Sequence, residues 1–179
     1  MGKAKAGGII QNINLAKIGV MSVPDQPGIA SILLGALFDK NVNVQFISQA
    51  ADLNSRSNII ICVNIGDLEI SRLAIENVKT EINAEKIDYQ ANVAMVSVYG
   101  PHFKDQPGIA VIAFSALASV DVNIIAISTS ISTISCVVDN DKIDKAVDVL
   151  MSAFSVPTSS IFIASDGLSL HSRKGDNEK

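Results

Sequence analysis

The sequence repeats itself at a spacing of 80 residues. The hexamer Asp-Gln-Pro-Gly-Ile-Ala occupies residues 25–30 and returns at residues 105–110. When residues 25–50 are aligned with residues 105–130, half of the 26 positions are identical. Self-similarity at this period is typical of a duplicated supersecondary unit that is long enough to form a small domain. The sequence therefore predicts two tandem domains of the same fold within 179 residues.

The hydrophobic pattern predicts the order strand, helix, strand, strand, helix, strand in each copy. Strands show alternating apolar residues, and helices show apolar residues at i, i+3, i+4 and i+7. The first copy is predicted to have strands at 16–23, 41–47, 58–63 and 86–91, helices from 29 and over 67–82, and a polar loop over 50–57. The second copy is predicted to have strands at 93–99, 122–128, 134–138 and 160–164 and helices at 105–120 and 141–154. This βαββαβ order indicates two ferredoxin-like α+β domains, each an antiparallel sheet with both helices on one face.

Composition sets the expected domain limits and assembly. We expect domains at 9–91 and 92–165, with flexible termini at 1–8 and 166–179, where the sequence is small or polar and lacks periodicity. Hydrophobic residues make up 48% of the chain and aromatic residues only 4%, so both cores should be aliphatic. Domains of this size bury a limited share of their surface. Pairing of the two halves, and a homodimer, are therefore expected.

Charge and hydropathy argue against several classes of function. The net charge is −4 and the pI is about 5.0, which disfavours binding to nucleic acids or anionic membranes. The apolar run at residues 59–63 is too short to cross a bilayer. No hydrophobic stretch follows Lys3 and Lys5, as it would in a signal peptide. Two cysteines within strand patterns suit a reducing compartment. We expect a soluble cytoplasmic protein without nucleic-acid or membrane partners.

The first helix start of each copy is the most informative candidate site. A helix N-terminus presents free N–H groups and partial positive charge that can bind a carboxylate. Gly28 and Gly108 lack the Cβ that would keep a ligand from the backbone, and Asp25 and Asp105 could accept hydrogen bonds from an ammonium group. Together these groups could form a cradle for a free amino acid. The alternative is a structural helix start, capped by the aspartate, whose glycine serves the turn.

Other polar residues give weaker signals. Asn43 and Asn123 occupy equivalent positions in apolar strands and are either satisfied edge residues or ligand contacts. His102 and His171 have no partners at metal-ligand spacing, and the two cysteines are expected in the core on opposite sheet faces. The sequence has no phosphate-binding glycine loop. The residues alone therefore predict no metal site, no cofactor and no catalytic centre.

Several stretches resemble the paired ACT domains of aspartokinase. They are residues 24–30, 43–49, 122–130 and 134–139, and the last two contain Ile-Ser-Thr-Ser and Ile-Ser-Cys-Val-Val. The likeness covers about residues 8–165 and implies a non-catalytic regulatory function, since the amino-acid kinase domain that normally precedes these domains is absent from this chain. A chain of this length is similar to the small regulatory (beta) subunit of some aspartokinases, which implies feedback control of lysine and threonine biosynthesis.

The resemblance also implies where an effector would bind. In this family, lysine or threonine binds where the first ACT domain of one chain meets the second ACT domain of its partner in a dimer. The implied effector contacts are Asp25, Gly28, Ala30, Gln49, Asn123, Ile124 and Ser130. Pseudo-symmetry implies a second pocket formed by Asn43, Asp105, Gly108 and Ala110. The implied protein partner is an aspartokinase catalytic subunit.

The chain departs from the family pattern in three places. Gln49 is followed by Ala-Ala-Asp where the family has Asn-Val-Ser, Ser57-Asn58 replaces Thr-Asp, and residues 100–105 replace a glycine-rich loop. These differences leave the fold unchanged and the identity of the effector open. The alternative function is a free-standing ACT-domain sensor or dimerisation module with another partner. An enzyme is the least supported function, because no nucleophile and base can be assembled from the sequence.

Overall fold

The computed structural model describes residues 3–157, 161–164 and 170–172, the last two ranges by their backbone alone. The chain forms two compact units. The first domain is Asn14–Val93, and the second domain combines Met1–Ile13 with Ala94–Lys179. Two long strands, β2 (Gly8–Pro24) and β5 (Lys86–Tyr99), contribute residues to both domains. No helix among the described residues is long and apolar enough to span a membrane.

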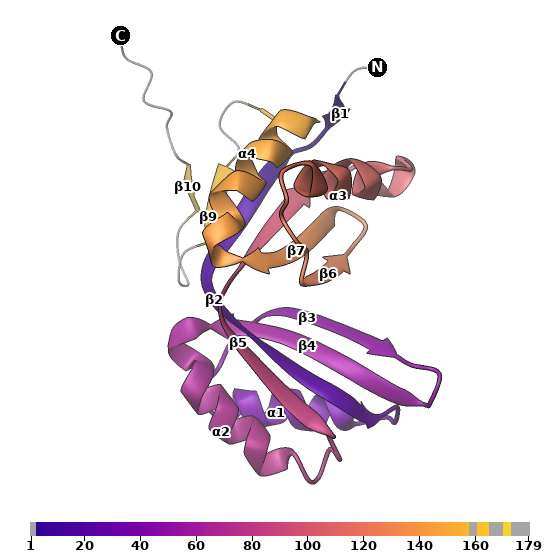
Figure 1. The fold of residues 1–179 in the computed structure, drawn as a ribbon, viewed down its shortest axis with the longest axis vertical. Coiled ribbons are helices and arrows are strands. Elements are labelled where there is room, and N and C mark those ends of the chain that lie inside the picture. The colour runs from indigo at the N-terminus through magenta and orange to yellow at the C-terminus, as the bar shows by residue number, and fades with distance from the viewer. Residues whose placement is uncertain (1–2, 158–160, 165–169, 173–179) are drawn as a thin grey trace. The chain divides into compact units, whose positions relative to one another are not determined.

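The first domain has the βαββαβ order that the repeat predicts. Between the β2 and β5 segments the chain forms α1 (Ile29–Phe38), β3 (Val44–Ala51), β4 (Arg56–Asn64), a short 3-10 turn (Ile65–Asp67) and α2 (Leu68–Val78). The strand order is β3-β4-β2-β5, and β4 is antiparallel to both β2 and β3. Helices α1 and α2 lie on one face of this sheet (Figure 1).

Alternation along the strands builds the core of the first domain. Ile18 and Val20 of β2 are fully buried and pack with Leu33 and Leu37, which are one helical turn apart on α1. Successive strand residues point to opposite faces, so Gly19, between the two buried residues, faces away from the helices. The aliphatic core expected from the composition is therefore present, and it fixes which face of the sheet remains uncovered by α1 and α2.

The second domain repeats the same order. After β5 come a 3-10 turn (Phe103–Asp105), α3 (Ile109–Ser119), β6 (Ala126–Thr129), β7 (Thr133–Asp139), a 3-10 turn (Asn140–Lys142), α4 (Ile143–Ala153), β8 (Phe154–Ser155), β9 (Ile161–Ala164) and β10 (Leu170–Ser172). The strand order is β10-β9-β2-β5-β7-β6. The predicted α+β fold of two βαββαβ units is thus confirmed.

The N-terminal residues differ from the expected flexible segment. Strand β1 (Ala4–Lys5) pairs in parallel with β8, and the first residues of β2 lie between β9 and β5, with Ile9 opposite Ile161. Ile9 is fully buried in the core of the second domain, where Ala6 also packs. Both apolar side chains are shielded from water in this position, which favours the association of residues expected to be flexible or to belong to the first domain with the second domain.

The expected flexible C-terminal segment also differs in part. Residues 170–172 of the stretch 166–179 form β10, antiparallel to β9. The remainder of that stretch, and residues 1–2, lie outside the described residues.

The β3–β4 hairpin extends into the region predicted as a polar loop. Ala51 pairs with Ser57, so only residues 52–55 form the turn. The Asp52 carboxylate accepts hydrogen bonds from the backbone N–H groups of Arg56 at 3.0 Å and Asn54 at 2.7 Å. Both bonds lower the pKa of the Asp52 carboxyl, and the bond from Arg56 has the larger effect. Strand β3 has 8 residues where β6 has 4, so the two copies differ in the length of this hairpin.

Candidate functional site

The two repeated hexamers form equivalent helix starts. Gly28 precedes α1 with φ 99°, and Gly108 precedes α3 with φ 91°, left-handed conformations that favour glycine. Both glycines are exposed, and a Cβ at either position would meet no atom within 4 Å. Neither helix has a side-chain hydrogen bond at its N-cap. The backbone of each first turn is therefore open to a ligand, and neither Asp25 nor Asp105 caps it.

A buried hydroxyl joins two of the predicted effector residues. Ser57 Oγ donates a hydrogen bond to Asp25 Oδ1 at 3.0 Å and accepts one from Gln49 Nε2 at 3.3 Å. Ser57 is fully buried, whereas Asp25 and Gln49 are exposed. The Asp25 backbone N–H also donates to the carbonyl of Ser55 at 3.0 Å. The β3–β4 hairpin thus holds the Asp25 carboxylate and the Gln49 amide beside the start of α1.

Arg56 fixes the turn end of this hairpin to β2. Its Nε donates to Ser22 Oγ at 3.1 Å, and its Nη2 donates to the carbonyls of Ser22 and of Asn83, the latter at 3.0 Å. The Asn58 side chain accepts a hydrogen bond from the Ser22 N–H at 2.9 Å. Ser57 and Arg56 were not among the predicted site residues. The only sequence signal was the departure from the family pattern at Ser57-Asn58.

Replacing Ser57 by alanine tests this link. Hydrogen bonds to charged groups contribute about 1.5–3 kcal/mol, and the lower end is expected here because Asp25 can bind water instead. Urea denaturation should therefore show a loss of about 1.5 kcal/mol. The matched control is Ser71→Ala, another fully buried serine of the first domain, which donates to the uncharged carbonyl of Asp67 at 2.6 Å. A loss no larger than that of the control would contradict a charge-assisted bond to Asp25.

The second helix start lacks this connection. Among the described residues, no hydrogen bond joins Asp105 to the β6–β7 hairpin. That hairpin is closed by Ser130, whose N–H donates to the carbonyl of Thr133 at 2.8 Å and whose hydroxyl accepts from the N–H of Ser132 at 3.3 Å. Phe103 is buried in the loop that precedes the helix, against Gly100, where a Cβ would collide with the ring. The two helix starts therefore have the same backbone conformation, but different side-chain contacts hold them in place.

The predicted contacts fall into both domains. Asp25, Gly28, Ala30, Gln49 and Asn43 belong to the first domain. Asn123, Ile124, Ser130, Asp105, Gly108 and Ala110 belong to the second domain. The structure brings Asp25 and Gln49 together through Ser57. Ala30, Ala110 and Ile124 are half-buried, and the remaining predicted residues are exposed. A site completed by a second chain stays a prediction.

The cysteines and His102 show no reactive environment. Burial raises the pKa of both thiols, Cys62 and Cys136, to about 12, with Lys17 opposing the shift at Cys62. Cys136 packs in the core beneath α3 and α4, while Cys62 lies between core residues Ile61 and Val63 and so points to the other face of its sheet. The thiols therefore stay protonated near neutral pH. His102 is exposed in a loop, and the side chain of His171 lies outside the described residues.

No group of three acidic, histidine or cysteine side chains lies close enough to hold a metal ion in the part of the chain that the structure describes.

Comparisons with known proteins agree with this fold. Residues 16–82 and residues 96–154 each match a sequence family described as ACT domain. A crystal structure of aspartokinase alpha and beta subunits is similar at 32% identity and a TM-score of 0.74, covering 83% of this chain and 97% of that one. The ligand-free regulatory subunit of aspartate kinase from Thermus thermophilus is similar at 29% identity and a TM-score of 0.75, covering 84% and 99%.

A full-length relative matches only in part. The aspartokinase of Helicobacter pylori is 32% identical over 149 residues, which are 83% of this chain and 36% of the relative. The chain thus spans little more than a third of the curated relatives that it matches, but almost the whole of the two solved chains. Since both of its domains match ACT families as well, this chain belongs to the ACT-domain regulatory part of the aspartokinase family.

Proposed function

We propose that this chain is a non-catalytic regulatory subunit of an aspartate kinase, which senses lysine or threonine and exerts feedback control on their biosynthesis. One observation carries the proposal: the likeness extends over 99% of a solved regulatory subunit. The proposed protein partner is an aspartokinase catalytic subunit, and the proposed location is the cytoplasm. The paired domains provide the binding surface, and the kinase activity resides in the partner.

The effector would bind at the start of α1. Its carboxylate accepts hydrogen bonds from the open backbone N–H groups after Gly28, where the helix dipole favours negative charge. Its ammonium group donates to the Asp25 carboxylate, which Ser57 holds in place. Ala30 and Gln49 complete the first-domain side of this cradle. The aspartate and the helix start thus select a molecule that carries both charges.

A second chain would complete the cradle. In the proposed homodimer, Asn123, Ile124 and Ser130 of the second domain of one chain face the first domain of the other. Pseudo-symmetry places a second pocket at Asn43, Asp105, Gly108 and Ala110. An effector that binds one dimer arrangement more tightly than another shifts the population toward that arrangement. The shift is what the catalytic subunit would detect.

Thermal unfolding in the presence of each free amino acid tests the proposal. A ligand at about 100 times its dissociation constant adds roughly 2.7 kcal/mol to the stability of the state that binds it. We expect lysine or threonine to raise the unfolding temperature in a concentration-dependent way, with the D-enantiomers as controls. The absence of a shift with every amino acid would refute the sensor function.

Co-purification distinguishes a regulatory subunit of aspartate kinase from a free-standing ACT-domain sensor. A free-standing ACT sensor with another partner would show the same thermal shift but would not retain an aspartokinase catalytic chain. We expect the catalytic chain of the native host to co-purify with this subunit and its activity to change with the effector.

A further inference from the structure

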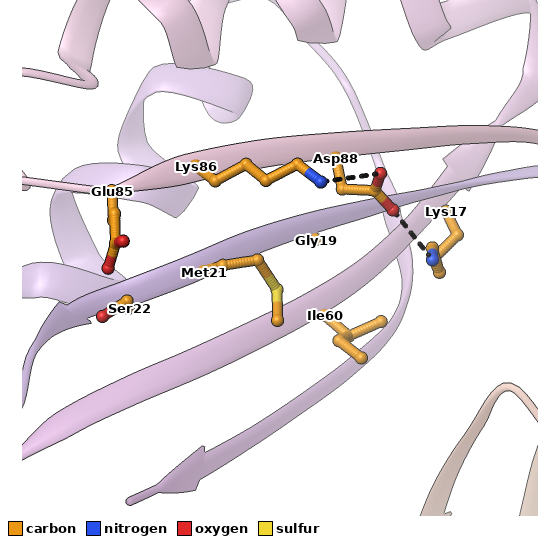
Figure 2. A pocket seen from close by; sticks show the side chains of 8 residues that line it. All are labelled: Lys17, Gly19, Met21, Ser22, Ile60, Glu85, Lys86 and Asp88. Carbon is orange, nitrogen blue, oxygen red and sulfur yellow. Dashed lines mark hydrogen bonds and ion pairs between the residues drawn. The ribbon is translucent and has the colours of Figure 1, made fainter. Parts of the chain in front are cut away.

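A groove of about 460 Å³ crosses the face of the first-domain sheet that α1 and α2 leave uncovered (Figure 2). Its floor is formed by Gly19 and Met21 of β2 and by Ile60 of β4. These residues alternate with the buried residues Val20 and Ile59, so they point away from the helix-covered core. None of the predicted effector contacts lines the groove.

Gly19 has no side chain, so none projects from this position of β2 into the groove. A Cβ at this position would lie 3.2 Å from Met21 Sδ and 3.7 Å from Asp88 Cβ, so a larger residue would fill the space between them. Glycine inside a strand weakens the strand and often marks a place where another molecule approaches the backbone. The half-buried Met21 and Ile60 side chains offer an apolar surface beside this opening.

Positive charge is in excess at one end of the groove. Asp88 lies between two ammonium groups, with Lys17 Nζ at 3.2 Å from Oδ2 and Lys86 Nζ at 4.0 Å from Oδ1. Figure 2 shows Lys86 running toward this carboxylate while Lys17 reaches it from the other side. The Lys17 side chain is only 14% exposed, whereas that of Lys86 is 71% exposed. One carboxylate cannot neutralise both, so Lys86 is available to a ligand anion.

Negative charge lies at the other end. Glu85 lines the groove there beside Ser22, and it makes no ion pair among the residues that the structure describes (Figure 2). Arg56 contacts Ser22 at this end, and its guanidinium already donates to the Ser22 hydroxyl and to the carbonyl of Asn83. The groove is therefore polarised, with a cation at one end, a carboxylate at the other and apolar side chains between them.

We propose that this groove is a second ligand site, separate from the cradle at Gly28, and that it binds an amino acid with a branched aliphatic side chain. The ligand carboxylate pairs with Lys86, its ammonium group faces Glu85, and its aliphatic group covers Met21 and Ile60. The site goes beyond the proposed effector function because it shares no residue with the cradle and lies within one chain.

Binding can be measured directly on the full chain. With protein labelled on its methionine methyl groups, L-leucine should shift the NMR signal of Met21, identified by its loss in Met21→Leu. The matched probes are 4-methylpentanoate, which lacks the amino group, and 3-methylbutylamine, which lacks the carboxylate. We expect weaker binding of the first and none of the second. No shift with L-leucine up to its solubility limit, or equal affinity for 4-methylpentanoate, would overturn the assignment.

Variants locate the site. Gly19→Val should remove binding of L-leucine, and Lys86→Gln should weaken it about tenfold, which corresponds to about 1.4 kcal/mol. Lys86 is an exposed side chain, so its variant keeps the proposal testable if Gly19→Val does not fold. The control is Gly35→Ala in α1, where a Cβ meets nothing within 4 Å. Unchanged affinity for L-leucine in Lys86→Gln would refute the site. Gly28→Val should leave binding of L-leucine unchanged, which separates this site from the cradle.

Discussion

Gly28→Val should abolish effector binding at the first helix start while the protein remains folded. Nothing lies within 4 Å of the position of a Cβ at Gly28, so the valine side chain fits but projects into the space that the ligand carboxylate needs. Affinity for lysine or threonine, measured by titration calorimetry, is expected to fall by about 100-fold or more, or roughly 2.8 kcal/mol. The left-handed φ of 99° adds strain of about 1–3 kcal/mol, which denaturation would reveal separately.

Gly108→Val is the matched control because it introduces the same side chain into the same backbone conformation. With φ 91° and no neighbour within 4 Å, Gly108 differs from Gly28 only in its surroundings. This variant should remove the second pocket and leave affinity at the first unchanged, so the number of ligands per chain falls. Unchanged affinity in Gly28→Val, with the fold intact, would show that the cradle lies elsewhere.

Local patterns explain which parts of the fold could be predicted from the sequence. Helix α1 begins at Ile29 and α3 at Ile109, directly after the glycine of each repeated hexamer, because the glycine turn and the apolar stripe are encoded in a few adjacent residues. The N-terminal strand could not be placed in this way. Ile9 pairs with Ile161 at the other end of the chain, and such a distant pairing leaves no periodic signal in a single sequence.

The candidate site was predictable only in its outline. The repeat and the resemblance indicate Asp25 and Gln49, but the departure from the family pattern at Ser57-Asn58 does not reveal that the Ser57 hydroxyl joins them. Residues 50–57 are polar without alternation, so they were predicted as a loop, whereas the hairpin that includes Ser57 is held by hydrogen bonds of Asp52 and Arg56. Polar side chains that bond to each other across a hairpin leave no hydrophobic pattern for sequence analysis to detect.

The division of β2 between two domains predicts opposite effects for two similar substitutions. Ile9 and Ile18 are both fully buried on this strand, but Ile9 packs in the core of the second domain and Ile18 in the core of the first. Replacing a buried isoleucine by alanine costs about 2–5 kcal/mol through lost burial and the cavity left behind. Ile9→Ala should therefore destabilise the domain that contains α3 and α4, and Ile18→Ala the domain that contains α1 and α2.

Hydrogen exchange measured on peptic peptides can assign each loss of stability to its domain. In Ile9→Ala, amides of α3 and α4 should exchange faster while those of α1 and α2 change little, and Ile18→Ala should show the reverse. Each variant serves as the control for the other, because residue type, burial and strand are the same. If the domains instead divided at residues 9–91, as the repeat alone predicts, both substitutions would loosen α1 and α2. That result would show that the N-terminal part of β2 does not belong to the second domain.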